Sequence, residues 1–400
     1  MICFMKKIHQ TLALIFLFLL SPFVSGHELV SIPSLDGKLM LPGYWFPVNA
    51  KEPRPAVITL HGCNGALDDS AHLNRSWMRD AGWFNAEKMH LLVLDSFTPR
   101  GLKSICDIPP MRRTIQEEDR RNDVFAAIQW LAQQPGVDRN RIVIMGRSHG
   151  GQTALSVLDR SDKAVQAQTI QPRAVIALYP GCVKFTKMWN YELSAPLLLM
   201  IGESDDWTQA KYCVELHEKV KRAQKNATFE LHVFPNSYHA FDSTGPVRTM
   251  TNVGGTRSGT ATVGGNPEAR EKAHRLMFDF LSAQWKEPLL MTHEERMKGH
   301  HYAVPAASGF ASIHDIAAVP LAEAGRSRYA HYLEQPAPKA FVITEKNGWF
   351  FSVADPEAMR LSMSYCRNVK CWLYAVDDRV VWEADVSKRI DHARLVRQTP

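Results

Sequence analysis

Six short, nearly continuous apolar segments recur between residues 28 and 284, and helix-like segments separate them. Runs of this kind are typical of parallel strands that helices cover on both faces. We expect strands at 55–60, 90–94, 141–145, 174–179, 196–201 and 228–234. Because strand and helix alternate, the pattern predicts an α/β fold with a mostly parallel, doubly wound sheet and right-handed crossovers.

The helical segments between these strands have recognisable ends. One helix is expected to start near Thr114, with acidic residues in its early turns, and to end before Pro135-Gly136. A helix-like run at 153–158 follows the third strand. Another helix should begin after Asn266-Pro267, because apolar residues follow there at helical spacing.

The pattern changes near residue 303. A chain of 400 residues exceeds what one hydrophobic core usually organises, so a second, smaller domain is expected. The last hundred residues carry signals for a mixture of strands and one helix, which predicts a small C-terminal α+β module. The strand signals lie at 340–344, 349–353, 371–376 and 379–382, and the helical one at 356–366. The expected divisions are a large α/β domain at 27–285, a linker or exposed helix at 286–302, and the module at 303–400.

The first 26 residues have the features of a signal peptide. Lys6 and Lys7 form a basic start, 12–20 is an unbroken apolar run, and Val24-Ser25-Gly26 offers a cleavage site, so the mature chain would begin at His27. The apolar run is shorter than the roughly 20 residues that span a bilayer, although a retained anchor is the alternative. We expect an exported protein, periplasmic or secreted, with no membrane span in the mature chain.

Cysteine content agrees with export. Cys3 belongs to the expected signal peptide, and six cysteines remain: Cys63, Cys106, Cys182, Cys213, Cys366 and Cys371. Six cysteines in an oxidising compartment permit three disulfides in 15 pairings, and buried free thiols are the alternative. We expect no metal site, because the chain has no C-x-x-C pair. A formal charge of +6 without a dense basic block argues against nucleic-acid binding.

A serine nucleophile is predicted at Ser148. The segment 146–151 reads GRSHGG, a G-x-S-x-G pattern that directly follows a predicted strand and precedes a helix-like run. In that context the serine sits on a sharp strand-to-helix turn, and the flanking glycines allow the turn to pack closely. A structural glycine-rich turn is the alternative interpretation.

A serine hydroxyl is a weak nucleophile and needs a base and an orienting acid. His239 follows the sixth strand and is the expected base, whereas His232 lies inside that strand. The acid is expected at Asp205, after the fifth strand, with Asp206 and Glu203 as alternatives. Carboxyl ends of parallel strands share one edge of the sheet, so these residues can converge.

Two backbone amides are expected to stabilise an oxyanion. One is the N–H of His149, directly after the serine, and the other is the N–H of Cys63 in the loop 61–65 (HGCNG). Four side chains near strand ends are candidates for lining a substrate pocket, although each could instead support the sheet edge. They are Arg147, Trp207, Tyr179 and Phe241.

Four motifs, taken together and in this order, resemble the dienelactone hydrolase family of α/β-hydrolases. They are HGCNG (61–65), GRSHGG (146–151), GESDDW (202–207) and YHAFD (238–242). The resemblance covers about residues 30–284 and implies an α/β-hydrolase fold acting on esters without a metal or an organic cofactor. The name-giving enzymes use a cysteine nucleophile, whereas this chain has Ser148. Residues 303–400 resemble a C-terminal segment found on some exported bacterial members of the family.

The expected function is hydrolysis of a small-molecule or polymer-borne carboxylic ester through an acyl-serine intermediate. A peptidase of the same fold and a non-catalytic protein that binds the cell envelope are the alternatives. Cys63, Cys106, Cys182 and Cys213 follow predicted strand ends, so we expect disulfides 63–106 and 182–213 beside the active site. A third disulfide, 366–371, is expected in the C-terminal module. The sequence leaves the oligomeric state open.

Overall fold

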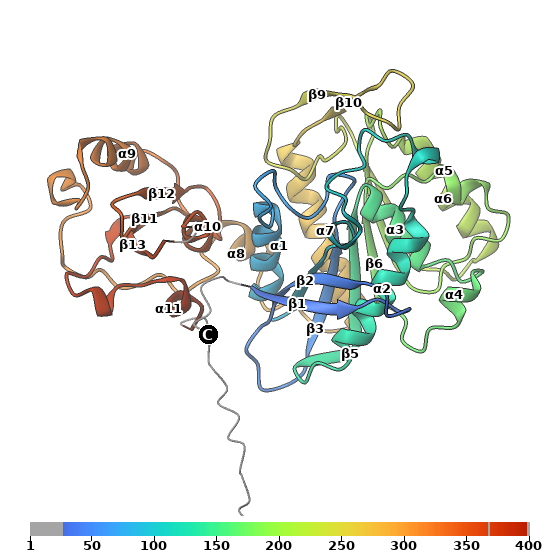
Figure 1. The fold of residues 1–400 in the computed structure, drawn as a ribbon, viewed down its shortest axis with the longest axis horizontal. Helices are drawn as coiled ribbons and strands as arrows, with labels where there is room; N and C mark the ends of the chain where they lie inside the picture. Colours follow the sequence, from blue (N-terminus) through green and yellow to red (C-terminus); the bar gives the residue numbers. More distant parts are fainter. Residues whose placement is uncertain (1–26, 367–368, 398–400) are drawn as a thin grey trace, which may run out of the picture.

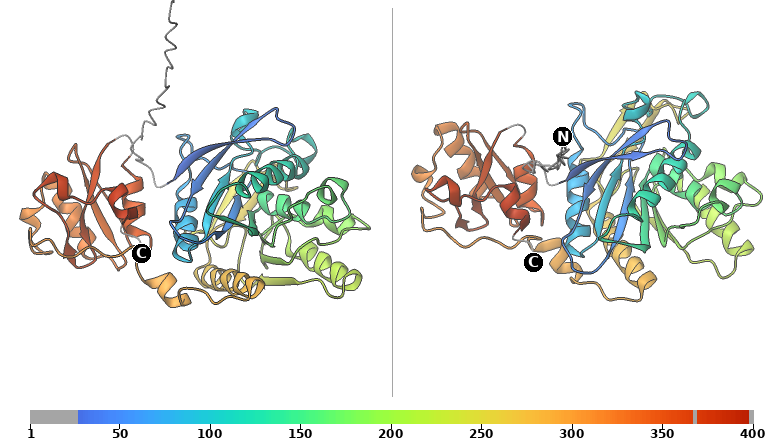
Figure 2. Two further views of the ribbon diagram at one scale, coloured as in Figure 1. Left: turned by 90° about the horizontal axis from the view of Figure 1, so that it is seen from below. Right: turned by 60° about the horizontal axis from the view of Figure 1, so that its bottom comes forward.

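The computed structural model of the chain describes residues 27–366 and 369–397, so the expected signal peptide, residues 1–26, lies outside the described residues. A large α/β part and a smaller C-terminal module lie side by side (Figures 1 and 2). In the described part of the chain, no helix has the length and apolar composition needed to cross a bilayer.

The large part is built on an eight-stranded sheet with the order β1-β2-β4-β3-β5-β6-β7-β8. From β4 to β8 all neighbours run parallel, while β1, β2 and β4 pair antiparallel. The strands are β1 (Glu28–Pro33), β2 (Met40–Phe46), β3 (Arg54–Leu60), β4 (His90–Leu94), β5 (Val137–Arg147), β6 (Ala174–Leu178), β7 (Leu197–Gly202) and β8 (Phe229–Phe234). This sheet confirms the predicted α/β class and all six predicted strands.

Strands β1 and β2 were not predicted. In β1 the side chains alternate between exposed and partly buried, and Ile32 is its one fully buried residue. An edge strand with one solvent-facing side lacks the continuous apolar run that identified the central strands. All residues of β4 and β6, by contrast, are buried.

Helices cover both faces of the sheet (Figure 2). Helices α1 and α7 contact each other through Phe84 and Phe278, while α2 and α3 pack together against β3 and β5. The helices of this part are α1 (Arg75–Ala86), α2 (Glu117–Leu131), α3 (His149–Val157), α4 (Lys163–Gln166), α5 (Val183–Lys187), α6 (Ala210–Ala223) and α7 (Pro267–Trp285), with 3₁₀ turns η1 (Thr98–Arg100) and η2 (Pro110–Arg112). Helix α2 begins at Glu117 and not near Thr114, because the side chain of Asp119 accepts the Gln116 N–H at 2.8 Å in a capping box.

A short hairpin, β9 (Arg248–Thr251) and β10 (Thr260–Val263), follows the β8 loop and was also not predicted. Its first strand is mostly exposed, and its second strand alternates between partly buried and buried residues, so neither has a continuous apolar run. The hairpin is joined to the loop that carries His239, because the Gly264 N–H donates to the His239 carbonyl at 3.0 Å.

The C-terminal module is a four-stranded antiparallel sheet with helices, in the order β12-β11-β13-β14. This confirms the predicted α+β module, although α9 was not predicted. Its elements are η3 (Ile316–Ala318), α9 (Glu323–Leu333), β11 (Ala340–Thr344), β12 (Trp349–Ser352), α10 (Ala358–Ser364), β13 (Cys371–Val376), β14 (Arg379–Val380), η4 (Val386–Lys388) and α11 (His392–Arg397).

The segment expected as a linker or exposed helix contains α8 (His293–Lys298), and most of its described residues are exposed or partly buried, but a few of its side chains are buried. The Arg296 guanidinium is buried and pairs with Glu87 at the end of α1, with Nε to Oε1 at 2.9 Å. His301 is also buried, and its Nδ1 lies 2.6 Å from the Glu357 carboxylate of the module. The polar composition of the segment predicted exposure, but partners distant in the sequence bury the side chains of Arg296 and His301.

Candidate active site

Ser148 lies at the turn between β5 and α3, with φ 53° and ψ −116°. Its backbone N–H donates to the Leu178 carbonyl at 2.9 Å, which anchors the strained turn to β6. A Cβ at Gly146 would collide with the Gly150 carbonyl, and one at Gly150 would collide with Leu60. The glycines of the motif are therefore required by close backbone approach.

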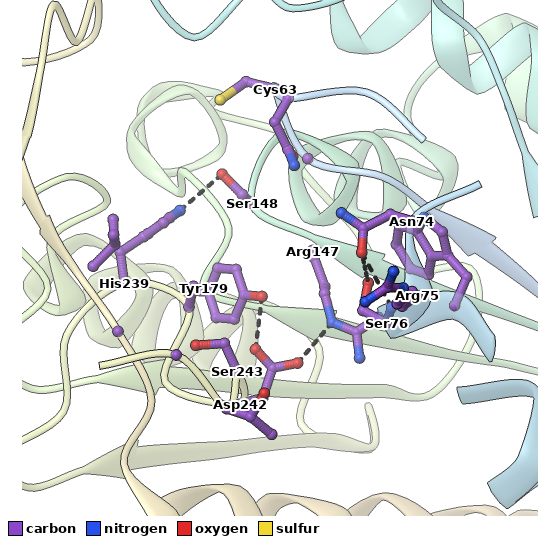
Figure 3. Close-up of a pocket in the computed structure, with 18 of the residues that line it drawn as sticks. Cys63, Asn74, Arg75, Ser76, Arg147, Ser148, Tyr179, His239, Asp242 and Ser243 are labelled. Atoms are coloured by element: carbon purple, nitrogen blue, oxygen red, sulfur yellow. Dashed lines mark hydrogen bonds and ion pairs between the residues drawn. The ribbon is translucent and has the colours of Figure 1, made fainter. Parts of the chain in front are cut away.

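Three side chains form one hydrogen-bonded chain at the carboxyl edge of the sheet. The Ser148 Oγ lies 2.9 Å from His239 Nε2, and His239 Nδ1 lies 2.8 Å from Asp205 Oδ2 (Figure 3 shows the first of these contacts). His239 and Asp205 are buried, while Ser148 is half-buried and borders a cavity. An imidazole in this position can accept the serine proton while a carboxylate orients it.

The two neighbouring aspartates have different partners. Asp205 Oδ1 accepts the N–H groups of Trp207 and Thr208 at 2.9 and 2.8 Å, which leaves Oδ2 directed at His239. Asp206 is exposed and instead accepts both the N–H and the hydroxyl of Thr262 in β10, each at 2.8 Å. Glu203 is exposed. Of the three acids considered, Asp205 is the one that contacts His239.

Thr208 makes hydrogen-bonding contacts with both Asp205 and His239, and it was not identified from the sequence. Its Oγ1 lies 2.9 Å from Asp205 Oδ2, 3.1 Å from His239 Nδ1 and 3.1 Å from the Tyr179 carbonyl. The available signal was the Asp-x-x-Thr spacing, in which an aspartate accepts backbone and hydroxyl donors a few residues later. The rings of Tyr179 and Trp207 pack on the imidazole, with centroids 4.7 and 4.8 Å from that of His239.

The backbone amides expected for an oxyanion lie next to Ser148. Within 27–366 and 369–397, no acceptor contacts the N–H of Cys63 or of His149. A Cβ built on Gly62 would lie 3.5 Å from the Ser148 Cβ, so the Cys63 loop approaches the serine closely. Cys63 is bonded to Cys106 at a Cα separation of 4.9 Å.

The other cysteines also pair in the expected way. Cys182 pairs with Cys213 and Cys366 with Cys371, at Cα separations of 5.1 and 6.1 Å. The first of these joins the start of α5 to α6. The second closes a short loop in the C-terminal module.

Arg120 in α2 contacts both segments that carry the amides expected for an oxyanion, and it was not identified from the sequence. It is fully buried and donates to the His61 carbonyl and to His149 Nδ1, both at 2.8 Å. Burial, and then the Arg120 charge, holds the pKa of His149 well below its ordinary value, so the imidazole is neutral and can accept this bond. No local pattern marks such a contact, because the partners come from three separate segments.

The serine opens on a cavity of about 660 Å³ that Arg147, Trp207 and Tyr179 help to line. The expected substrate-binding residue Arg147 is already neutralised: its Nε contacts Asp242 at 2.6 Å (Figure 3 shows this contact), and its Nη1 contacts Asp80 at 2.6 Å. Burial by itself would lower the Arg147 pKa, but these two carboxylates raise it well above its ordinary value. The Tyr179 hydroxyl donates to Asp242 at 2.8 Å, which links the network to the ring beside the base.

Phe241 is fully buried beneath Tyr179, with ring centroids 5.6 Å apart, and it supports the sheet edge instead of lining the cavity. His232 lies on β8 beside Glu230, away from the serine. Among the described residues, no group of three or more histidine, cysteine or acidic side chains is arranged to hold a metal ion.

Comparison with known families gives one match to a family model. The model of the dienelactone hydrolase family matches residues 45–284, from β2 to α7. The chain belongs to the dienelactone hydrolase family. This confirms the resemblance of the four motifs and makes the protein a hydrolase.

A curated relative, a probable 2-oxo-3-(5-oxofuran-2-ylidene)propanoate lactonase from Bradyrhizobium sp, is 25% identical over 203 residues, covering 47% of this chain and 73% of that protein. Solved structures include a putative dienelactone hydrolase from Klebsiella pneumoniae subsp. pneumoniae MGH 78578, with 18% identity, 64% of this chain and 98% of that chain covered, and a TM-score of 0.46. Thermogutta terrifontis esterase 2 has 18% identity, 68% and 98% coverage, and a TM-score of 0.48.

The dienelactone hydrolase match ends at residue 284, yet one residue beyond it reaches the cavity. Tyr365, which directly follows α10 of the C-terminal module, lines the same cavity as Ser148 and His239. In this member of the family, the cavity beside Ser148 is therefore lined in part by a residue from outside the family domain.

Proposed function

We propose that this protein is a serine-dependent carboxylic ester hydrolase that works through an acyl-serine intermediate. The observation that carries the proposal is the hydrogen-bonded chain from Asp205 through His239 to Ser148, which opens on the 660 Å³ cavity. A cavity of this size suits a ligand considerably larger than an acetyl ester. The three cysteine pairs also support export, because disulfides persist in oxidising compartments.

In the proposed acylation step, His239 Nε2 accepts the Ser148 proton as Oγ attacks the ester carbonyl carbon. The carbonyl oxygen becomes an oxyanion, which the N–H groups of Cys63 and His149 bind. Collapse of the tetrahedral intermediate breaks the carbon–alkoxy bond, and the imidazolium returns its proton to the leaving alcohol. Asp205 holds the imidazole tautomer and stabilises its charged form.

In deacylation a water molecule takes the place of the alcohol. His239 accepts one water proton, the hydroxide adds to the acyl carbon, and Ser148 leaves with the proton that returns from the imidazole. The products are a carboxylic acid and regenerated enzyme. A lactone is an internal ester, so the activity named for the Bradyrhizobium relative would follow the same steps.

The test uses p-nitrophenyl esters of increasing acyl length. The wild-type protein should show burst kinetics, and Ser148→Ala should lose both the burst and turnover. A fluorophosphonate probe should label the peptide that contains Ser148. Unchanged ester turnover in Ser148→Ala would refute the proposal. Faster cleavage of anilides than of esters would favour a peptidase. If neither esters nor anilides are cleaved, a binding protein is favoured.

The two adjacent aspartates provide a matched control. Asp205→Asn should lower kcat by about 10³–10⁴-fold, because an amide can hold the wrong imidazole tautomer. Asp206→Asn removes the same charge one residue away. The native Asp206 side chain contacts Thr262 and not His239. It should leave kcat within about twofold. Equal losses in both variants would contradict the assignment of Asp205.

A further inference from the structure

The hydroxyl of Thr208 touches both partners of Ser148 in the hydrogen-bonded chain, on the side of the imidazole away from the serine. Its Oγ1 lies 2.9 Å from Asp205 Oδ2 and 3.1 Å from His239 Nδ1. Ser148 contacts the other ring nitrogen, Nε2 (Figure 3). Thr208 is not one of the described residues that line the cavity, so any effect of its hydroxyl on catalysis acts through the imidazole.

The Thr208 hydroxyl has a second acceptor within reach, the Tyr179 carbonyl at 3.1 Å. Tyr179 directly follows β6 and has a φ of 38°, a left-handed conformation that is strained for a bulky side chain. Its N–H donates to the Met200 carbonyl of β7 at 2.6 Å. The strained residue therefore places its ring on the imidazole and its carbonyl on the Thr208 hydroxyl.

Two further contacts fix the position of Thr208. Its backbone N–H donates to Asp205 Oδ1 at 2.8 Å, and helix α6 begins two residues later. Cys213 in α6 is bonded to Cys182, which lies three residues after Tyr179. The disulfide therefore joins the segment that carries the Tyr179 carbonyl to the helix that follows Thr208.

The single proton of the hydroxyl limits how these contacts are made, because a hydroxyl donates one hydrogen bond and accepts two. In the proposed mechanism His239 Nε2 accepts the Ser148 proton, so Nδ1 carries the ring proton and Thr208 accepts from it. The Thr208 proton then goes either to Asp205 Oδ2 or to the Tyr179 carbonyl. A rotation about the Cβ–Oγ1 bond interchanges the two, and no heavy atom has to move.

The two orientations of the hydroxyl differ in their effect on a charged imidazole. With the proton on Asp205, the carboxylate oxygen divides its charge between two donors. With the proton on the Tyr179 carbonyl, that oxygen faces the imidazole alone, and Oγ1 presents its lone pairs to Nδ1–H. The second orientation stabilises the imidazolium more than the neutral ring, because hydrogen bonds to a charged group are the stronger ones.

We propose that Thr208 is a positioning residue whose hydroxyl turns from Asp205 to the Tyr179 carbonyl as the imidazolium of His239 forms. The inference rests on the proposed ester hydrolase function. The hydroxyl keeps its proton throughout, and only the acceptor of its hydrogen bond changes. An interaction that is stronger in the transition state than in the resting enzyme raises kcat and leaves KM unchanged.

The experiment removes the hydroxyl and keeps the shape of the side chain. Thr208→Val should lower kcat for p-nitrophenyl acetate about tenfold with KM within about twofold of the wild type, because one hydrogen bond to a charged group is lost. Thr208→Ser supplies the hydroxyl again and should bring kcat to within about threefold of the wild type. A role of the side-chain methyl group in packing would leave Thr208→Ser as impaired as Thr208→Val.

Thr262→Val is the matched control. The Thr262 hydroxyl lies 2.8 Å from Asp206 Oδ2, so it has the same relation to the neighbouring aspartate, which does not contact His239. This variant should keep kcat within about twofold of the wild type.

The Asp205→Asn background gives a second comparison. There the imidazole has already lost its orienting carboxylate, so adding Thr208→Val should lower kcat by less than about threefold. A purely structural role of Thr208 would instead multiply the two losses.

The labelling rate of Ser148 by a fluorophosphonate separates this inference from the esterase proposal, because labelling needs the serine and its base but no ester. The second-order labelling rate should fall about tenfold in Thr208→Val and recover in Thr208→Ser. A wild type that is labelled but hydrolyses no ester would refute the esterase function, and the labelling rates would still decide the role of Thr208.

The inference is overturned if Thr208→Val is labelled at the wild-type rate, or if Thr208→Ser fails to restore that rate. It is equally overturned if Thr262→Val loses as much kcat as Thr208→Val, or if the losses of Asp205→Asn and Thr208→Val multiply.

Discussion

Replacing Arg120 by methionine should damage catalysis more than folding. The buried guanidinium donates to the His61 carbonyl and to His149 Nδ1, so it ties together the two loops that carry the proposed oxyanion donors. Methionine fills much of the same space but donates no hydrogen bond. The loops would then be free to shift relative to Ser148.

The expected loss in kcat follows from the role of the donors. Removing one oxyanion donor outright costs about 10²–10³ in kcat, and a displaced donor retains part of its effect. We therefore expect Arg120→Met to lower kcat by about 10- to 100-fold with KM little changed.

The expected change in stability is smaller, because two effects oppose each other. Two buried acceptors lose their donor, at about 1–3 kcal/mol each. Against this, burial lowers the Arg120 pKa to about 9, so the charged group is itself costly to bury by a few kcal/mol. The net change in unfolding free energy should remain within about 2 kcal/mol.

Arg121→Met is the matched control for Arg120→Met. Arg121 is the next residue of α2, is also buried, and pairs with Asp162 at 2.7 Å instead of with either oxyanion loop. It should retain kcat within about twofold while losing about 1 kcal/mol of stability. Turnover of p-nitrophenyl acetate and urea unfolding measure both quantities. Equal kcat losses in the two variants, or a fully active Arg120→Met, would refute the bracing role.

Three other perturbations test the rest of the structure. Gly82→Ala should destabilise the protein by about 2–4 kcal/mol in urea unfolding, because displacing the buried Glu357 outweighs the gain in helix propensity; a stabilised variant would contradict the docking contact. The double variant Cys63→Ser/Cys106→Ser opens a 43-residue separation and should lose about 4 kcal/mol of stability as well as kcat, and unchanged turnover would show that the loop needs no disulfide. Burial lowers the pKa of His274 well below its usual value, so the unfolded state binds a proton that the folded state does not. The free energy of unfolding should therefore fall as the pH drops below about 6.5, by at most about 1.4 kcal/mol per pH unit. His274→Phe should flatten that slope between pH 7 and 4.

Much of the central architecture was readable because its signals are local. Strands buried on both faces are continuous apolar runs, and each predicted run is a strand of the large sheet. The glycines around Ser148 mark a turn whose requirement comes from atoms a few residues away. Exposed or one-sided strands such as β1 and β9 carry weaker local signals, and they were missed for that reason.

The composition of the site beyond the motifs depends on contacts between distant segments. Asp205 and Asp206 are adjacent and chemically identical, and their roles differ because one faces His239 and the other faces Thr262 on a hairpin that was not predicted. Arg120 reads as one more polar residue of an amphipathic helix, yet the fold buries it against two loops.

The amino-acid order by itself determined where the chain forms buried strands, where a serine can occupy a tight turn, and which polar loops follow the strands, because such features depend on residues within a few positions of each other. The tertiary structure alone decided which carboxylate meets the imidazole and that the charge of Arg147 is already neutralised. It also decided that Tyr365, more than 200 positions after Ser148 in the sequence, lines the same cavity as Ser148. Those outcomes depend on how separate segments pack, and packing distances are not encoded in any local pattern.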